Sequence, residues 1–250
     1  MPDTAVRPTR AGARPRQPAV LAHSDSLEAS PSLRTQAYER FTQKVVNGRL
    51  RPGQFVSQRE LVKLLDMPLG AVREAIPRLE AARLIVTVPK RGLQVAHVDL
   101  KLVRNAFQVR AMIEREAVTH FVRQVGDAEL AVLEKAHRSI LVRAESGRTD
   151  PKLDEDAQAV DWGLHERMVD AMGNEILSEI YRVNSLHVRM IRLDAHQVRP
   201  RRVLPAMQEH LRFIERLKER DEAGAVQVMS EHIENSRQRV VNAMLDQAET

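Results

Sequence analysis

Between residues 32 and 82 the apolar side chains recur every three or four positions, which is the spacing of amphipathic helices. This spacing predicts three short helices, over 33–46, 58–65 and 71–82. Asn47-Gly48 ends the first helix, and Ser57 with Glu60 forms the S-x-x-E pattern of a capping box at the start of the second. Residues 66–70 contain a proline and a glycine and are predicted to form the tight turn before the third helix.

Two β-rich runs follow, over 84–88 and 93–96, and Pro89-Lys90-Arg91-Gly92 separates them. This pattern is typical of a hairpin with a basic tip. Three helices, with a tight turn between the last two, and a basic hairpin describe a winged helix-turn-helix, which we expect over 32–98. Its third helix would enter a DNA major groove.

Beyond Val98 only helical periodicity remains. Breaks in this periodicity divide the rest of the chain into six predicted helices, over 99–125, 127–146, 154–172, 175–198, 201–219 and 222–247. Asp99, Asp127 and Asp221 are the expected N-caps. The predicted fold class is therefore mainly α, with an N-terminal winged helix-turn-helix and a C-terminal all-α six-helix bundle over 99–250.

Charge is divided unevenly between these two parts. Residues 1–98 carry 16 lysines and arginines against 8 acidic residues, a net of +8, whereas residues 99–250 carry 23 against 26, a net of −3. An N-terminal part that binds a polyanion such as DNA fits this division, and a solvated basic face is the alternative. Residues 1–31 hold five of the twelve prolines and several arginines, so they are predicted to be a disordered basic tail.

Composition excludes several classes of protein. The chain has no cysteine, which rules out a disulfide scaffold and thiol chemistry, so a bound metal would need histidine and carboxylate ligands. Only 3% of the residues are aromatic, which disfavours an all-β fold. Because the sequence has no run of 18 apolar residues and no apolar signal core, we expect a soluble cytoplasmic protein without a membrane partner.

Three histidines in the predicted bundle fall on or beside apolar stripes. Asp161 and His165 lie one helical turn apart and project from one face, while His210 and His232 lie within the stripes of the last two helices. Together they would make an N₃O site for a divalent metal, with positions left for water or a ligand. The alternative is a set of ordinary core histidines, because spacing along the chain does not establish convergence. The other histidines of this part, His137 among them, are expected to be structural or surface residues.

The segment from Tyr38 to Ala96 resembles the GntR family of bacterial transcription regulators. The motifs that carry the resemblance are Asn47-Gly48-Arg49-Leu50-Arg51-Pro52-Gly53-Gln54, Gln58-Arg59-Glu60-Leu61, Ala71-Val72-Arg73-Glu74-Ala75-Ile76, Arg78-Leu79-Glu80 and Lys90-Arg91-Gly92. Carried over by position, the resemblance implies that Arg59 and Arg73 make the principal DNA contacts. It also implies that Lys90, Arg91 and Gly92 form the tip of the wing.

Three residues depart from the family pattern. Leu69 stands where a base-reading arginine is usual, so the operator sequence of relatives does not transfer. Pro77 lies within the predicted recognition helix and is expected to kink or end it. Arg83 replaces the usual glycine after that helix, which puts a left-handed backbone at this position in question.

The helical part resembles the FCD ligand-binding domain of the same family, in which a D-x-x-x-H pair and two later histidines supply metal ligands. Asp161 with His165, then His210 in Glu209-His210 and His232 in His232-Ile233, match this pattern in order and approximate spacing. The resemblance therefore implies that these four residues bind a divalent ion. Zinc is the expected ion, with nickel and manganese as alternatives. Six helices rather than seven indicate the VanR-like branch.

The implied function is transcription regulation by a repressor that binds a palindromic operator as a homodimer. The implied effector is a small carboxylate or other anion held at the metal. Effector contacts are expected from Arg110, which matches the family's R-x-x-x-E, and from Arg189 and Arg192. A pairing of Arg110 with Glu114 on the helix surface is the alternative for the first of them. Asn174 also matches the family pattern and is expected to cap a helix rather than touch the ligand.

Two other interpretations compete with this one. A metal-dependent hydrolase or oxygenase would use the same cluster, but that function gives the winged helix no role. The sequence also lacks G-x-S-x-G, a glycine-rich phosphate loop and H-E-x-x-H, so we expect no enzyme activity. The third interpretation is a regulator whose metal is purely structural.

Overall fold

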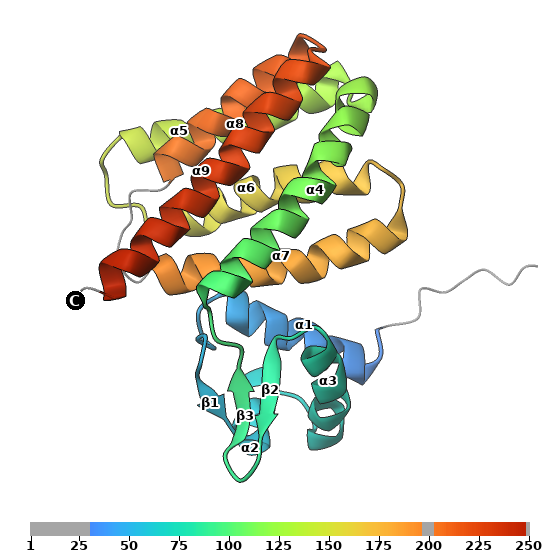
Figure 1. The fold of residues 1–250 in the computed structure, drawn as a ribbon, viewed down its shortest axis with the longest axis vertical. Helices are drawn as coiled ribbons and strands as arrows, with labels where there is room; N and C mark the ends of the chain where they lie inside the picture. Colours follow the sequence, from blue (N-terminus) through green and yellow to red (C-terminus); the bar gives the residue numbers. More distant parts are fainter. Residues whose placement is uncertain (1–30, 197–202, 249–250) are drawn as a thin grey trace, which may run out of the picture. The chain divides into compact units, whose positions relative to one another are not determined.

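The computed structural model of the protein describes residues 31–196 and 203–248 (Figure 1). The predicted basic tail, apart from Pro31, and the junction between the fourth and fifth predicted helices of the bundle lie outside the described residues. Mainly helical structure is confirmed throughout the described part, with one small sheet near the N-terminus.

The first part is a winged helix-turn-helix, as predicted. Its elements are α1 (Leu33–Val46), β1 (Phe55–Val56), α2 (Gln58–Leu65), α3 (Leu69–Ala81), β2 (Ile85–Val88) and β3 (Gly92–Val95). The strands form an antiparallel sheet in the order β1-β3-β2, in which Phe55 faces Gln94 and Ile85 faces Val95. The sequence prediction contained the hairpin but missed β1, because two residues are too short to show an alternating pattern.

The capping box at the start of α2 is confirmed. The Ser57 hydroxyl accepts a hydrogen bond from the Glu60 backbone N–H at 3.2 Å, and the Glu60 carboxylate accepts one from the Ser57 N–H at 2.7 Å. These two bonds satisfy donors that the first turn of a helix leaves unpaired, so they fix where α2 begins.

Helix α3 differs from its prediction at three points. It begins at Leu69, two residues early, with Pro68 as an N-cap that makes no side-chain capping hydrogen bond. It continues through Pro77 to Ala81 rather than ending there. Arg83 adopts φ 54°, and the Leu84 N–H bonds to the Leu79 carbonyl at 2.9 Å, so the left-handed C-terminal turn forms without the usual glycine.

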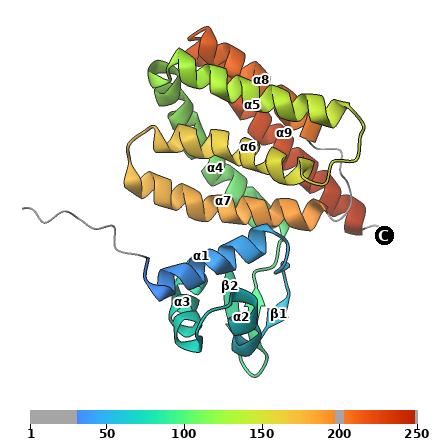
Figure 2. The same cartoon turned by 180° about the vertical axis from the view of Figure 1, so that it is seen from behind.

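The second part contains only helices among its described residues. They are α4 (Leu100–Gln124), α5 (Asp127–Glu145), α6 (Leu153–Asp170), α7 (Glu175–His196), α8 (Val203–Lys218) and α9 (Glu222–Ala248). Helix α4 packs against α6, α7 and α9, and α5 packs against α8. Figure 2 shows α6 between α5 and α7, with both of which it is in contact.

Two of the three predicted N-caps are correct. The Asp99 carboxylate accepts a hydrogen bond from the Leu102 N–H at 2.6 Å, and that of Asp221 accepts one from the Gly224 N–H at 2.9 Å. The prediction for Asp127 is wrong by one residue. Gly126 is the N-cap of α5, and Asp127 is the first residue of the helix, where its charge still favours the N-terminal dipole.

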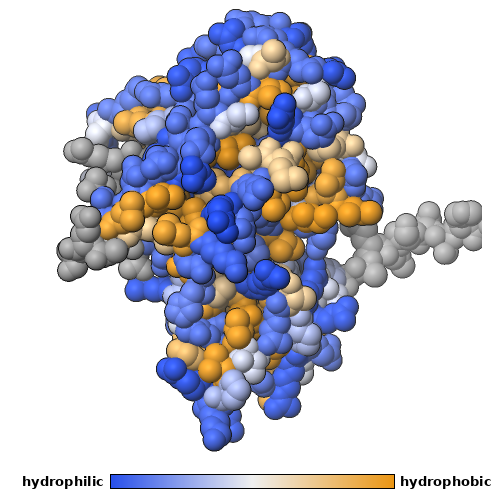
Figure 3. Space-filling model, in the orientation of Figure 1, coloured by the Kyte–Doolittle hydropathy of each residue, from blue (hydrophilic) through white to orange (hydrophobic). Residues whose placement is uncertain are grey.

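Apolar side chains gather in separate cores for the two parts. The winged-helix core includes Phe41, Leu61 and Leu79, and Met190 of α7 is buried within it because α7 also packs against α1. The helical core includes Phe107 and Phe213. Figure 3 shows further apolar side chains across the middle of one face. The exposed large apolar residues among the described positions of α4 and α7 are Leu100, Met112, Ile176 and Ile180. Within the described residues, none of the helices combines the length and apolar character needed to cross a membrane.

Candidate metal centre

Three helices bring four candidate ligands together inside the helical part. Asp161 and His165 come from α6, His210 from α8 and His232 from α9. Each residue offers one ligand atom, and these atoms all lie within 4.8 Å of one another. All four side chains are buried, with at most 3% of their surface exposed. The convergence that spacing alone left open is therefore present.

The imidazoles of His165 and His232 are held by carboxylates. Nδ1 of His165 lies 2.8 Å from Oε2 of Glu114 on α4, and Nδ1 of His232 lies 2.7 Å from Oε2 of Glu209 on α8. An ionised carboxylate only accepts, so both Nδ1 atoms carry the proton and donate it. The Nε2 atoms of both rings consequently present lone pairs, the form in which imidazole binds a metal.

Ionisation of the cluster follows from burial and neighbouring charge. Burial, together with the positive charge of Arg110, lowers the pKa of His165 to about 4, and burial lowers the pKa of His210 well below its usual range. Burial alone would raise the pKa of Glu209, but hydrogen bonds from His232 and Arg239 lower it to about 2. At neutral pH the imidazoles are therefore neutral and the carboxylate is ionised.

Asp161 turns one oxygen to a guanidinium and the other to the histidines. Its Oδ2 accepts a hydrogen bond from Nη1 of Arg192 at 2.5 Å, whereas its Oδ1 lies 3.6 Å from Nε2 of His210 and accepts no hydrogen bond from any described residue. Burial would raise the pKa of this carboxyl, but Arg192 and the imidazoles hold it well below its ordinary value. An ionised, buried oxygen without a donor is suited to a cation.

The donor set fits a divalent metal ion. Nε2 of His210 and Nε2 of His232 are 3.3 Å apart, and Oδ1 of Asp161 is close to the first of them. Nε2 of His232 and Oδ1 of Asp161 both present lone pairs, so Nε2 of His210 beside them either carries a proton or, when unprotonated, repels them unless a cation lies between. Three imidazoles and one carboxylate suit zinc, nickel or manganese, and none of these is selected by the ligand types alone.

Arg110 enters this centre from α4. It is fully buried, its Nε donates to Glu114 at 2.6 Å, and its Nη2 lies 2.6 Å from Nε2 of His165. Tyr181 of α7 donates to the same Glu114 carboxylate at 2.6 Å. Nη1 of Arg110 has no partner among the described residues. The arginine and a metal ion would therefore use the same lone pair of His165.

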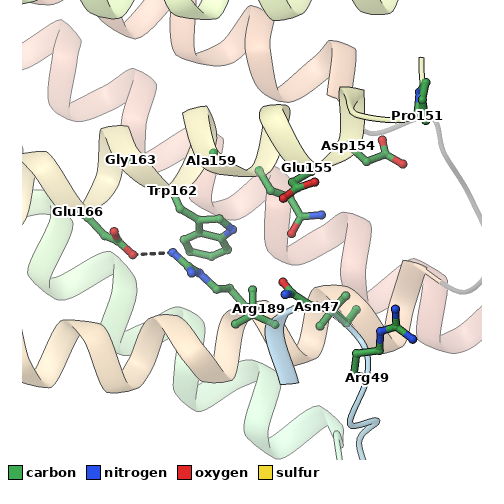
Figure 4. A pocket seen from close by; sticks show the side chains of 13 residues that line it. Asn47, Arg49, Pro151, Asp154, Glu155, Ala159, Trp162, Gly163, Glu166 and Arg189 are labelled. Atoms are coloured by element: carbon green, nitrogen blue, oxygen red, sulfur yellow. Dashed lines mark hydrogen bonds and ion pairs between the residues drawn. The ribbon is translucent and has the colours of Figure 1, made fainter. Parts of the chain in front are cut away.

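The indole of Trp162 separates the centre from a surface pocket of about 680 Å³. Figure 4 shows the indole descending from α6 and Arg189 rising from α7 to meet it, with Arg189 bonded to Glu166. The guanidinium carbons of Arg189 and Arg192 lie 4.7 Å and 5.3 Å from the ring centroid. Both predicted arginines thus reach the same aromatic side chain, and Arg192 also reaches Asp161.

Asn174 is not brought into this cluster. Its side-chain oxygen accepts a hydrogen bond from the Leu177 N–H at 3.1 Å, so it caps α7 as expected. Residue spacing missed His137, which lies against His210 at the centre although we expected an ordinary structural or surface histidine. Its place in the stripe of Leu130 and Ile140 on α5 is the kind of signal that singled out His210 and His232.

The predicted DNA-contacting residues lie on the surface of the winged helix. Arg59 and Arg73 are both exposed, and Nε of Arg73 donates to the Gln58 side chain at 3.0 Å. Lys90 and Arg91 are exposed at the hairpin tip. Gly92 has φ 96°, and a Cβ there would lie 3.3 Å from the Val56 carbonyl oxygen. The backbone conformation and this close contact therefore favour glycine at the tip, whether or not the residue touches DNA.

Acid is expected to destabilise the protein when metal is removed by a chelator. His165 has a pKa of about 4 when folded and 6.5 as its ordinary value, so between these pH values the unfolded chain binds a proton that the folded chain does not. The free energy of unfolding should therefore fall as pH drops below 6.5, at up to about 1.4 kcal/mol per pH unit for each such histidine, and this contribution should be flat above pH 6.5. Urea denaturation in EDTA between pH 7.5 and 4.5 measures the slope. An unchanged midpoint over this range would contradict the buried, neutral cluster.

Comparison with known families assigns both parts of the chain. Residues 33–95 match "Bacterial regulatory proteins, gntR family", and residues 105–235, just over half of the chain, match the "FCD domain".

Individual proteins give the same result. The chain is 28% identical over 208 residues to the uncharacterized HTH-type transcriptional regulator BphR of Paraburkholderia xenovorans, covering 82% of this chain and 84% of that protein. It is 24% identical over 198 residues to the regulator YdhC of Bacillus subtilis, covering 79% and 86%. Among solved structures, McbR/YncC of E. coli superposes with a TM-score of 0.71 at 20% identity, covering 88% of this chain and all of that one, which supports the fold.

Proposed function

Because the chain belongs to the GntR family of bacterial regulators and carries an FCD domain after its winged helix, we propose that it is a repressor that responds to an anionic metabolite. The coarser statement, a transcriptional regulator with an effector-binding domain, follows from family membership. The proposal adds a divalent metal held by Asp161, His165, His210 and His232, and an effector that binds next to it.

The observation that carries the proposal is that the candidate ligand atoms all point into one buried space. Imidazole lone pairs and a carboxylate oxygen converge in a buried space, and the second polar atom of Asp161, His165 and His232 is held by a neighbouring side chain. A fully partnered outer set of this kind is typical of metal sites. A bound divalent ion would supply positive charge and open coordination positions for an oxygen ligand.

The balance of buried charge favours an anionic effector. The carboxylates of Asp161, Glu114 and Glu209 are matched by the guanidiniums with which they bond, those of Arg192, Arg110 and Arg239. The protein groups are therefore neutral as a set, and a divalent ion adds two positive charges that they do not compensate. Each carboxylate group of a small effector supplies one of the missing negative charges.

Effector contacts are proposed for Arg110, Arg189 and Arg192. Nη1 of Arg110 is buried without a partner among the described residues, and Arg189 and Arg192 lie over the indole of Trp162. A guanidinium holds a carboxylate through two parallel hydrogen bonds. Zinc remains the expected ion, and membership of the VanR-like branch remains a prediction.

On DNA we propose that two copies act together on a palindromic operator in the cytoplasm. Arg59 and Arg73 would contact the major groove, and Lys90, Arg91 and Gly92 would lie at the wing tip. Exposed apolar side chains on α4 and α7 supply surface for self-association. A two-fold protein matches half-sites about one helical turn apart. The metal-enzyme interpretation is not favoured, since the relatives are regulators.

A thermal-shift screen of carboxylates tests this function. We expect one class of carboxylate to stabilise the zinc-loaded protein by about 2.7 kcal/mol at a hundred times its Kd, which raises Tm by about 5–10 °C for a chain of this size. The same compound should have no effect after chelation. Stabilisation that is equal with and without metal would contradict the proposed place of the effector. The single tryptophan, Trp162, gives an independent fluorescence readout at the site.

A further inference from the structure

We propose that His137 is a positioning residue of the metal centre, and that it sets the tautomer and the orientation of His210. This inference rests on the proposed function, because it concerns how the cluster presents a ligand to the ion. His137 lies on α5, which supplies none of the four ligands, and it is completely buried. Its ring meets that of His210 edge to face, with centroids 5.2 Å apart and an interplanar angle of 70°.

The protons along this pair are fixed by a backbone carbonyl. Nδ1 of His137 lies 2.7 Å from the Leu133 carbonyl oxygen, which only accepts, so this nitrogen carries the proton. A neutral ring with its proton on Nδ1 presents a lone pair at Nε2. That atom lies 3.1 Å from Nδ1 of His210, so it is placed to accept a hydrogen bond when the proton of His210 is on Nδ1, the tautomer in which Nε2 is free to bind a metal. Nε2 of His210 is then unprotonated and faces Asp161 and His232.

His137 completes a set in which every ligand has its own partner. Glu114 holds His165, Glu209 holds His232, and Arg192 holds Asp161. Without His137, Nδ1 of His210 would be a buried donor with no acceptor, or the ring would adopt the tautomer that places a proton on the ligand atom. Each described helix from α4 to α9 thus contributes a group to the centre.

The partner of His210 differs from the other two because it is neutral. Glu114 and Glu209 are carboxylates that raise the basicity of the imidazoles they hold, whereas a neutral imidazole raises it less. Holding His210 with His137 fixes its orientation without adding a fourth buried negative charge. The positive charge of a bound ion is then left for the effector to neutralise.

Two substitutions separate orientation from packing. His137→Phe keeps an aromatic ring of similar size but removes the acceptor. His137→Gln keeps an acceptor, because a glutamine amide occupies nearly the place of imidazole Nε2. We expect the Phe variant of the full chain to bind zinc about 10–100-fold more weakly, and the Gln variant to bind within about threefold of the wild type. Competition with a chromophoric chelator measures the affinities, and cobalt absorption spectra report the ligand field.

A second readout does not depend on affinity. Nitrogen-15 NMR of the histidine rings in chelated wild-type protein should show His210 protonated at Nδ1, and this signal should shift towards a mixture of tautomers in His137→Phe. Equal zinc affinity for the Phe variant and the wild type, or protonation of His210 at Nε2, overturns the inference. If His137→Phe fails to fold, the tautomer of His210 measured by NMR in the wild-type protein tests the inference alone.

The two proposals fail in different ways. A wild-type protein that binds no zinc, nickel or manganese contradicts the metal-dependent function, while the NMR measurement still tests the His137–His210 pair. A wild-type protein that binds metal normally, with both His137 variants unchanged, contradicts only the role of His137.

Discussion

Replacing His210 with alanine is expected to abolish stoichiometric metal binding and, with it, the response to effector. His210 is central in the cluster, with its Nε2 within 3.3 Å of His232 and 3.6 Å of Asp161. Its loss removes one of four ligands, so the affinity should fall by more than the about 10–100-fold caused by loss of an outer partner. Metal content after dialysis against zinc, and Tm with and without carboxylate, measure the effect.

His120→Ala is the matched control, because it removes a histidine of α4 that lies outside the cluster. It should leave metal content and effector response unchanged. Circular dichroism in EDTA establishes that both variants are folded. If His210→Ala retains a full equivalent of zinc and the normal effector shift, the sensor function proposed for this centre is wrong.

Replacing Arg73 with alanine is expected to remove operator binding while leaving metal binding intact. Arg73 is exposed on the recognition helix α3, and its guanidinium bonds to Gln58 at the start of α2. A bidentate arginine contact is worth about 1–3 kcal/mol, and a dimer makes it twice. The Kd should therefore rise by about 30-fold to 20,000-fold. Gel-shift titration at constant salt, on a fragment that the wild-type protein selects from genomic DNA, measures this loss.

Arg104→Ala controls for the lost charge, since Arg104 is an exposed arginine on α4 of the helical part. It should change the Kd by less than about threefold, because a distant surface charge acts only through the screened field. An Arg73→Ala protein that binds the fragment as tightly as the Arg104→Ala protein would contradict the placement of α3 in the groove. An enzyme would show no DNA-binding defect with either variant.

Most of the helical framework follows from local sequence. Apolar spacing predicted α1 and α2 close to their observed bounds, since a sharp signal marks one terminus of each: Asn47-Gly48 follows α1, and the Ser57 capping box precedes α2. The errors lie where tertiary contacts override local preference. Strand β1 exists because Phe55 and Val56 pair with β3, a partner almost forty residues away. Helix α3 survives Pro77 because its neighbours Ile76 and Leu79 are buried in the core.

Only part of the metal centre could be predicted from the sequence. Asp161 and His165 are related by one helical turn, so their common face could be derived from spacing. His210 and His232 were indicated by their stripes, but their meeting with α6 depends on how three helices pack. The partners Glu114 and His137 were not predicted for this role, because each lies on another helix, 51 and 73 residues from the histidine it holds.

Two residues of α7, Met190 and Arg192, contact the two functional halves of the chain. Met190 is buried in the winged-helix core, where α7 packs against α1, and Arg192 bonds to the Asp161 carboxylate. Two positions along a helix differ by about 200° of rotation, so these side chains leave α7 on nearly opposite sides. Side chains two residues apart on one helix therefore connect the winged-helix core with a candidate metal ligand.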